Sequence, residues 1–291
     1  MKHIKSFRAN NISDLDESVI REKEYLYQHT VLNESGLPQE VITYDPDGTV
    51  EHKYKYQYNA EGKVIDELLI EADDEVTQHR SMEYNAEGLL AKEYVHYLDG
   101  TADQLIYTYD KEGHLISRRS IDSEGETGNY LVIVYDDGKM VSETEYEIGG
   151  EIITQHRIVY DEQGNISEEL FRTPEEIYSL LHSYDETGQA SVRRRYNKDK
   201  HLMERHTYTY DSEGRISESM EETSSGIEIT YITYDNAGNV ILQEEKTEDG
   251  ELISSFERSY DDSNRLLTNS VFYNKPGPQA AHHYRVRMQY E

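Results

Sequence analysis

The chain has 291 residues, of which 35% are hydrophobic and 30% charged, and its formal net charge is −30. This acidity opposes binding to nucleic acid or anionic lipid, whose phosphates need cationic partners, although it also keeps a long exposed sheet soluble. The absence of cysteine excludes disulfides and thiol chemistry. The low apolar content is offset by 26 tyrosines, whose rings bury apolar area while keeping a polar tip.

The first 24 residues precede any regular pattern. Residues 13–17, followed by Val19 and Ile20, predict the start of a short capped helix, so we expect residues 1–24 to form an N-terminal cap. The basic start has no apolar segment of signal-peptide type, and no stretch approaches the length of a membrane span. We therefore expect a cytoplasmic protein, with secretion by a leaderless route left open.

From Leu32 onward one phrase returns ten times at a spacing of 24 to 26 residues. It consists of an aromatic residue or Leu, then Asn or Asp, two variable positions, usually Gly, and an apolar residue two positions later. A self-similarity of this length predicts a repeat architecture. The first residue of each copy, called the anchor below, is Leu32, Tyr58, Tyr84, Tyr109, Tyr135, Tyr160, Tyr184, Tyr210, Tyr234 or Tyr260.

Each repeat has the pattern of a β-hairpin. His206, Tyr208 and Tyr210 alternate with other residues, which is the period of a strand. Asp211 can bond to its own backbone and Gly214 accepts positive φ, so the phrase predicts a hairpin turn. We expect the anchor, the residue two before it and the apolar residue after the turn to line one face. A second, more variable turn lies midway between anchors.

Residues 25–275 therefore predict an all-β repeat array: an antiparallel sheet of about 20 strands built from β-hairpin repeats of about 25 residues. Open sheets rarely exceed about ten strands without curling. We expect a curled or spiralling sheet, with the Tyr and aliphatic columns on its concave face; whether it closes into a shell is left open. Residues 276–291 start with a Pro-Gly-Pro break and then alternate from His283 to Tyr290, which predicts a C-terminal capping strand.

The repeated phrase resembles the YD repeat of the Rhs family. Residues 210–216 read Tyr-Asp-Ser-Glu-Gly-Arg-Ile, with siblings at 109–115 and 234–240, and the resemblance covers about residues 32 to 275. It implies a long β-sheet that spirals into a hollow shell, often around a secreted toxin domain, and carbohydrate binding in some members. Large Rhs proteins also have many more repeats, a self-cleaving core and a toxin domain. None is visible here, so we expect a short, free-standing array.

No motif for a metal, a cofactor or catalysis is present. The twelve histidines are scattered, without a His-Glu-x-x-His spacing, and the adjacent pair His282 and His283 would face opposite ways on a strand. Acidic clusters such as residues 73–75 are interpreted as solvated turn carboxylates rather than calcium ligands. We expect no cofactor and no enzymatic activity. A hydrolase site on the concave surface stays an open third option, because it needs a convergent cluster that a sequence cannot reveal.

Two basic islands interrupt the acidic background. They have two interpretations: cross-strand pairing with nearby glutamates such as Glu168, Glu169 and Glu218, or a grip on a carboxylate or other anion of a partner. Under the second interpretation, the candidate partner-binding residues are the two islands and four tyrosines: Arg118, Arg119, Arg193, Arg194, Arg195, Tyr54, Tyr56, Tyr107 and Tyr208.

The leading hypothesis is a non-enzymatic protein-binding or scaffold protein that presents an acidic, Tyr-rich concave β surface. Its partner would be a protein with a basic surface, and the Rhs resemblance suggests an immunity- or chaperone-like partner of a basic secreted toxin or effector. The alternative is a carbohydrate-binding YD-repeat module, in which Tyr rings stack on sugars. The oligomeric state is left open.

Overall fold

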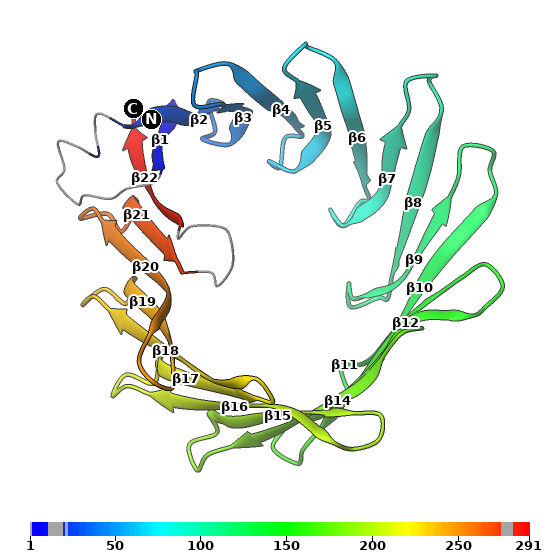
Figure 1. Cartoon of the computed structure of the whole chain (residues 1–291). Helices are drawn as coiled ribbons and strands as arrows, with labels where there is room; N and C mark the ends of the chain where they lie inside the picture. Colours follow the sequence, from blue (N-terminus) through cyan, green and yellow to red (C-terminus); the bar gives the residue numbers. More distant parts are fainter. Residues whose placement is uncertain (1, 11–19, 21–22, 275–281) are drawn as a thin grey trace. The chain divides into compact units, whose positions relative to one another are not determined.

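The protein is all-β. The computed structural model describes residues 2–10, 20, 23–274 and 282–291, and these residues form 22 strands (Figure 1). The first eleven are β1 (His3–Asn10), β2 (Tyr25–Leu32), β3 (Pro38–Tyr44), β4 (Val50–Tyr58), β5 (Val64–Glu71), β6 (Val76–Tyr84), β7 (Leu90–His96), β8 (Ala102–Tyr109), β9 (Leu115–Ile121), β10 (Thr127–Asp136) and β11 (Lys139–Tyr146). The others are β12 (Ile152–Tyr160), β13 (Ile166–Arg172), β14 (Ile177–Tyr184), β15 (Ala190–Asn197), β16 (Leu202–Tyr210), β17 (Ile216–Thr223), β18 (Gly226–Tyr234), β19 (Val240–Thr247), β20 (Leu252–Tyr260), β21 (Leu266–Tyr273) and β22 (His282–Tyr290).

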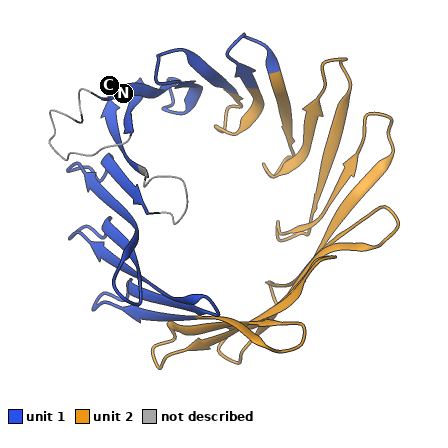
Figure 2. Cartoon of the chain, in the orientation of Figure 1, with its two compact units in different colours: residues 1–56, 69–76, 206–291 blue, residues 57–68, 77–205 orange. Residues whose placement is uncertain are grey.

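The strands fall into two compact units (Figure 2). Unit 1 comprises Met1–Tyr56, Leu69–Val76 and His206–Glu291, and unit 2 comprises Gln57–Leu68 and Thr77–Arg205. The predicted boundaries of the N-terminal cap and of the C-terminal segment fall next to residues 21–22 and 275–281, outside the described part of the chain, and stay predictions. Within the described ranges, no helix has the length and apolar character needed to cross a bilayer.

In unit 1 the first and last strands of the chain are neighbours. Strand β1 pairs antiparallel with β2 on one side and with β22 on the other. Next to these ladders, the backbone N–H of Lys2 donates to the carbonyl of Glu291 at 2.7 Å. The region predicted as a cap therefore contains a sheet strand, while the predicted helix start at residues 13–17 lies outside the described residues. The strand predicted from the alternation at 283–290 is confirmed as β22.

In unit 2 each strand from β6 to β14 pairs antiparallel with the next one along the chain. At the anchor turns the register shifts by one residue: Tyr109 is the cross-strand partner of Leu115, and the irregularity lies between Thr108 and Tyr109. Tyr160 and Ile166 repeat the same pairing. Opposed residues share a face, so the predicted face of tyrosines and apolar residues is confirmed. We call it the anchor face.

The anchor tyrosine connects successive repeats. Its ring lies opposite the apolar residue of its own turn, and its hydroxyl donates to the backbone carbonyl of the corresponding apolar residue one repeat earlier. In unit 2 these bonds are Tyr84 to Val64, Tyr109 to Leu90, Tyr135 to Leu115, Tyr160 to Met140 and Tyr184 to Ile166, at 2.8 to 3.3 Å. In unit 1 they are Tyr234 to Ile216 and Tyr260 to Val240, at 2.8 and 3.1 Å, and Tyr290 at the end of β22, which is not an anchor, forms the same kind of bond to Leu266 at 2.9 Å.

Several anchor rings are also covered by the residue that follows the turn glycine of the previous repeat. The Lys139 ammonium lies 4.9 Å from the ring centre of Tyr160, and the Arg215 guanidinium lies 4.4 Å from that of Tyr234. Such cation–π contacts add to the apolar burial of the ring. These anchors are thus fixed both at the hydroxyl and on one face of the ring, which helps to order a sheet with few fully buried aliphatic side chains.

Candidate functional site

The two basic islands are divided between the two faces of the sheet in unit 2. Arg118 lies opposite Tyr107, so it belongs to the anchor face, and its neighbour Arg119 points to the other face. Arg193 and Arg195 lie on the anchor face, whereas Arg194 lies opposite Leu181 on the other. The structure therefore does not bring each island together as one cationic patch. The other candidates, Tyr54, Tyr56 and Tyr208, belong to unit 1.

Three of these arginines are paired with carboxylates of the protein itself. The Arg118 guanidinium lies 3.4 Å from Glu145, a partner two strands along the sheet. Arg193 contacts Glu204 at 3.1 Å and Arg195 contacts Glu176 at 2.7 Å. The partners differ from the glutamates that the sequence suggested. A guanidinium that already faces a carboxylate has less to gain from an anionic ligand, so this geometry weakens the interpretation as an anion grip.

A second group on the anchor face of unit 2 was not singled out from the sequence. Glu169 on β13 accepts hydrogen bonds from two imidazoles, His156 on β12 at 2.7 Å and His182 on β14 at 2.8 Å. The Phe171 ring stacks on His156 at 4.2 Å and on Tyr178 at 4.9 Å. The histidines lie 13 residues on either side of Glu169. This half-repeat spacing is the signal that could have found them.

Three of the candidate tyrosines have defined polar or aromatic partners, Tyr107 in unit 2 and Tyr54 and Tyr56 in unit 1. The Tyr107 hydroxyl donates to Glu93 at 3.1 Å, and burial, followed by the charge of Glu93, raises its pKa to about 12. Tyr107 is thus a neutral hydrogen-bond donor at physiological pH. In unit 1, the Tyr54 and Tyr56 rings are stacked with centres 6.2 Å apart and planes inclined by 11°.

Unit 1 carries an acidic group on its anchor face. Glu221 on β17 is the cross-strand partner of Glu228 on β18, and Glu245 on β19 lies opposite Thr230 of the same strand. Burial, and then the charges of Glu245 and Glu221, raise the pKa of Glu228 above its ordinary value. Three carboxylates of like charge are therefore held on adjacent strands, an arrangement that an incoming cationic group would relieve.

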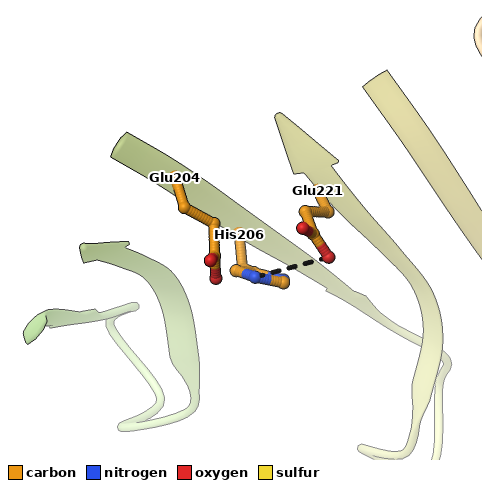
Figure 3. A group of neighbouring side chains, drawn as sticks. All are labelled: Glu204, His206 and Glu221. Atoms are coloured by element: carbon orange, nitrogen blue, oxygen red, sulfur yellow. Dashed lines mark ion pairs between the residues drawn. The ribbon is translucent and has the colours of Figure 1, made fainter. Parts of the chain in front are cut away.

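Strand β16 brings a histidine close to this acidic group. The His206 imidazole lies 3.7 Å from Glu221. Figure 3 draws this ion pair together with Glu204, which precedes His206 by two residues on β16. Glutamate and histidine are ligands that divalent cations accept. Glu204, however, already faces the guanidinium groups of Arg193 and Arg195, at 3.1 and 3.9 Å. These positive charges oppose a cation at Glu204, so we assign no metal site here.

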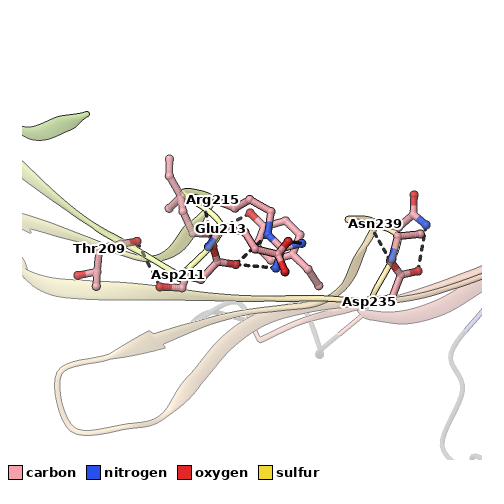
Figure 4. Close-up of polar contacts among 10 residues, drawn as sticks. Thr209, Asp211, Glu213, Arg215, Asp235 and Asn239 are labelled. Carbon is pink, nitrogen blue, oxygen red and sulfur yellow. Dashed lines mark hydrogen bonds and ion pairs between the residues drawn. The ribbon is translucent and has the colours of Figure 1, made fainter. Parts of the chain in front are cut away.

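The turn carboxylates have a structural role. The Asp211 carboxylate accepts the backbone N–H groups of Glu213 at 2.9 Å and Arg215 at 3.0 Å, and the Arg215 Nε donates to it at 2.8 Å (Figure 4). The backbone N–H of Arg215 is the first cause that holds the pKa of Asp211 below its ordinary value. Asp235 bonds to the backbone and the side chain of Asn239 in the same way. These carboxylates hold hairpin turns and are not available for other chemistry.

Comparison with known proteins finds a family model that matches part of the chain and several solved structures of low identity. A family model described as "Uncharacterised protein" matches residues 181–287. No curated protein matches the chain. Among solved structures, the chain is similar to TcdB2-TccC3, with 10% identity and a TM-score of 0.46 over 93% of this chain and 18% of that chain.

Two further solved structures are similar to the chain, again at low sequence identity. TcdB2-TccC3-TEV has 12% identity and a TM-score of 0.43, over 98% of this chain and 18% of that one. A porin-like protein from Bacteroides uniformis has 13% identity and a TM-score of 0.36, over 100% of this chain and 97% of that one. The chain thus spans 18% of the length of the two TcdB2-TccC3 chains that it resembles.

Proposed function

We propose that the chain is a short YD-repeat array of Rhs type that works as a non-enzymatic binding protein for a basic protein partner in the cytoplasm. The Rhs resemblance makes a basic toxin or effector the kind of partner that we favour, with the chain in an immunity- or chaperone-like role. The array supplies a rigid sheet, and acidic side chains on its anchor face supply the contact.

The observation that carries the proposal is the acidic group of Glu221, Glu228 and Glu245. Carboxylates on three adjacent strands repel each other, and burial together with that repulsion raises the pKa of Glu228. A lysine or arginine of a partner would remove the repulsion and gain hydrogen bonds to ionised acceptors. The surplus of acidic side chains, 59 against 29 basic ones, gives the same preference at long range.

Ion pairing within the sheet also favours a basic partner. Arg118, Arg193 and Arg195 each face a carboxylate of the chain itself. The charges left to attract a partner from solution are therefore predominantly negative. An electrostatic attraction of this kind raises the association rate and makes the affinity sensitive to salt.

A labelled peptide of alternating lysine and serine tests this proposal by fluorescence anisotropy. We expect the affinity to fall by about tenfold or more between about 50 and about 500 mM salt, because salt screens exposed charges. Substituting Glu221→Gln, Glu228→Gln and Glu245→Gln together should weaken binding at low salt. Binding that is indifferent to salt contradicts the proposal.

A matched control separates position from net charge. The turn after β19 carries three exposed acidic residues, so Glu248→Gln, Asp249→Asn and Glu251→Gln remove the same three charges away from the acidic group. We expect this control to bind the peptide nearly as well as the unchanged protein. Equal losses in both triple variants would mean that only the overall charge matters and that the acidic group is not a contact site.

One observation keeps carbohydrate recognition as a second candidate. The parallel rings of Tyr54 and Tyr56 form a two-ring aromatic step on β4, and aromatic rings are the surfaces on which sugars stack. Several anchor rings lack this property because a lysine, arginine or histidine covers them, as His114 does for Tyr135 at 4.8 Å. A glycan array probed with the protein and with Tyr54→Ala tests this candidate, and an array without hits removes it.

A further inference from the structure

The turn between β13 and β14 is shorter than its neighbours at the same edge of the sheet. It closes between Thr173 and Glu176, where the backbone N–H of the first donates to the carbonyl of the second at 2.8 Å. The previous turn at this edge closes over five residues, between Glu147 and Glu151 at 2.8 Å, and the next one spans residues 197–201 in the same way. In an antiparallel meander alternate turns share an edge. The short turn is therefore recessed between two longer ones.

A cleft of about 510 Å³ lies at this recess, in unit 2. That volume is in the range of pockets that accept a small molecule or one or two side chains. Its lining comes from all three turns and the adjoining strand ends: Glu147, Glu151, Ile152, Ile153, Arg172, Thr173, Pro174, Glu175, Glu176, Ile177 and Lys198. The cleft thus combines an apolar group of three isoleucines and a proline with charged side chains.

The charges of this cleft are unequally distributed. Glu147 and Glu151 belong to the turn on one side, and neither forms an ion pair with another described residue. Glu176 is neutralised by Arg195, at 2.7 Å. Lys198 belongs to the turn on the opposite side. Arg172 and Glu175 also line the cleft and add one charge of each sign. The cleft therefore has an acidic side at Glu147 and Glu151 and a basic side at Lys198, which would orient an occupant as well as attract it.

Apolar side chains continue beyond the lining. Ile148, at the tip of the acidic turn, is 68% exposed, and Leu202 and Met203, which follow the basic turn, are 52% and 47% exposed. Single exposed apolar residues are ordinary, but these three lie within or directly after, in sequence, the two turns that flank the cleft, and such a group is typical of a surface that binds a partner. A second copy of this chain is a poor occupant, because two chains of net charge −30 repel each other.

We propose that this cleft, called the turn cleft below, receives a large aliphatic side chain of a protein partner, with a lysine or arginine beside it contacting Glu147 and Glu151. The inference rests on the proposed function, because it supplies the specific contact that a long-range acidic attraction lacks. Burial of the aliphatic group against Ile152, Ile153 and Ile177 adds affinity that salt does not screen. Two other clefts of unit 2, one lined by Asn85, Tyr107 and Gly113 and one by Asn59, Tyr84 and Gly88, lie between anchor turns, whose residues are set by the repeat.

Two labelled peptides of equal charge test the turn cleft. One contains lysines and leucines, and the other has serine in place of each leucine. We expect the protein to bind the leucine peptide about tenfold more tightly. Ile177→Ser should abolish that preference without changing the affinity for the serine peptide, and Glu147→Gln with Glu151→Gln should weaken both. Val159→Ser, which alters another exposed aliphatic residue, at the far end of β12, should leave the preference intact.

The outcomes separate the two proposals. Equal, salt-sensitive binding of both peptides overturns the turn cleft and leaves the proposed function standing, whereas binding of neither peptide contradicts the proposed function itself. Methyl resonances of Ile152, Ile153 and Ile177 should shift on adding the leucine peptide; shifts confined to other isoleucines overturn the location. Sedimentation that reveals a dimer lost in Ile177→Ser would make a second copy the occupant and overturn the choice of partner. Circular dichroism checks that each variant is folded.

Discussion

The hydroxyl of the anchor tyrosine should be a measurable source of stability in its own right. Substituting Tyr109→Phe, Tyr160→Phe and Tyr184→Phe keeps the rings and removes three hydrogen bonds to backbone carbonyls. The three hydroxyls donate to Leu90, Met140 and Ile166 at 2.9, 2.9 and 2.8 Å. All three tyrosines are half-buried, so the carbonyl that loses its donor is only partly compensated by water.

The size of the effect follows from the geometry. Each bond is of ordinary length between neutral groups and contributes about 1 kcal/mol to the free energy of unfolding. The anchors stand at least two strands apart, which is about 10 Å at the usual strand spacing, so their effects should add. We therefore expect a loss of about 3 kcal/mol for the triple variant, against a total stability of about 5 to 15 kcal/mol for a typical domain.

Urea unfolding followed by far-UV circular dichroism measures this loss. Repeat arrays can unfold in more than one step, so amide hydrogen exchange of the strands around each anchor should accompany it. Tyr146→Phe is the matched control: its ring stacks on Tyr130, and its hydroxyl has no hydrogen-bond partner among the described residues. A triple variant as stable as the unchanged protein, or a control as damaging per site as an anchor, would refute the reasoning.

Three further outcomes follow from the turns and the ion pairs. Gly150 has φ +84°, a conformation that costs energy for any residue with a Cβ, so Gly150→Ala should lower the free energy of unfolding in urea by about 1 kcal/mol. Its neighbour Gly149 has no positive φ and open space around it, so Gly149→Ala should be neutral or stabilising. Backbone N–H groups are the first cause that lowers the pKa values of Asp211 and Asp261, so both carboxylates stabilise the fold above the ordinary pKa of Asp. This stabilisation is lost as the pH falls through the folded-state pKa values. Substituting both residues by Asn should therefore make the free energy of unfolding, measured in urea, depend less on pH in the acid range. The Arg195 guanidinium pairs with Glu176 and lies over the Tyr178 ring, so Arg195→Gln should lower the free energy of unfolding in urea by about 1 kcal/mol. Its affinity for the lysine–serine peptide should be equal to that of the unchanged protein or higher.

The sequence predicts the repeat, the hairpin turns and the anchor face correctly, because these depend on local chemistry. Asp211 and Gly214 determine a turn wherever they stand, and alternation defines a strand. Where glycine is missing, Lys200 and Asn264 adopt the same positive φ, at 63° and 60°, so the turn persists without its usual residue. The identity of the first strand was hidden because residues 3–10 pair with the other end of the chain, and no local pattern reports such a pairing.

Contacts across the anchor face could not be predicted from the two-residue alternation of side chains along a strand. The register shift at each anchor turn places Ile166 and Glu169 on the same face although they are three residues apart. Simple alternation would have put them on opposite faces. The same shift places Arg193 opposite His182 on the anchor face, and it thereby determines which glutamates lie near the arginines. The pairing of His156, Glu169 and His182 is therefore a product of turn geometry as much as of residue identity.

The two edges of the sheet differ in how far their residues are constrained by the fold. At the anchor edge, every repeat needs an aspartate or asparagine for the turn and a tyrosine hydroxyl for the previous repeat, so a substitution there removes structure before it changes recognition. At the other edge, the turns close one hairpin each, and neither their length nor their side chains are fixed by the next repeat. A single residue fewer at Thr173–Glu176 opens a cleft without disturbing the ladder of β13 and β14. Selection for a partner can therefore act on this edge while the anchor edge keeps the array folded.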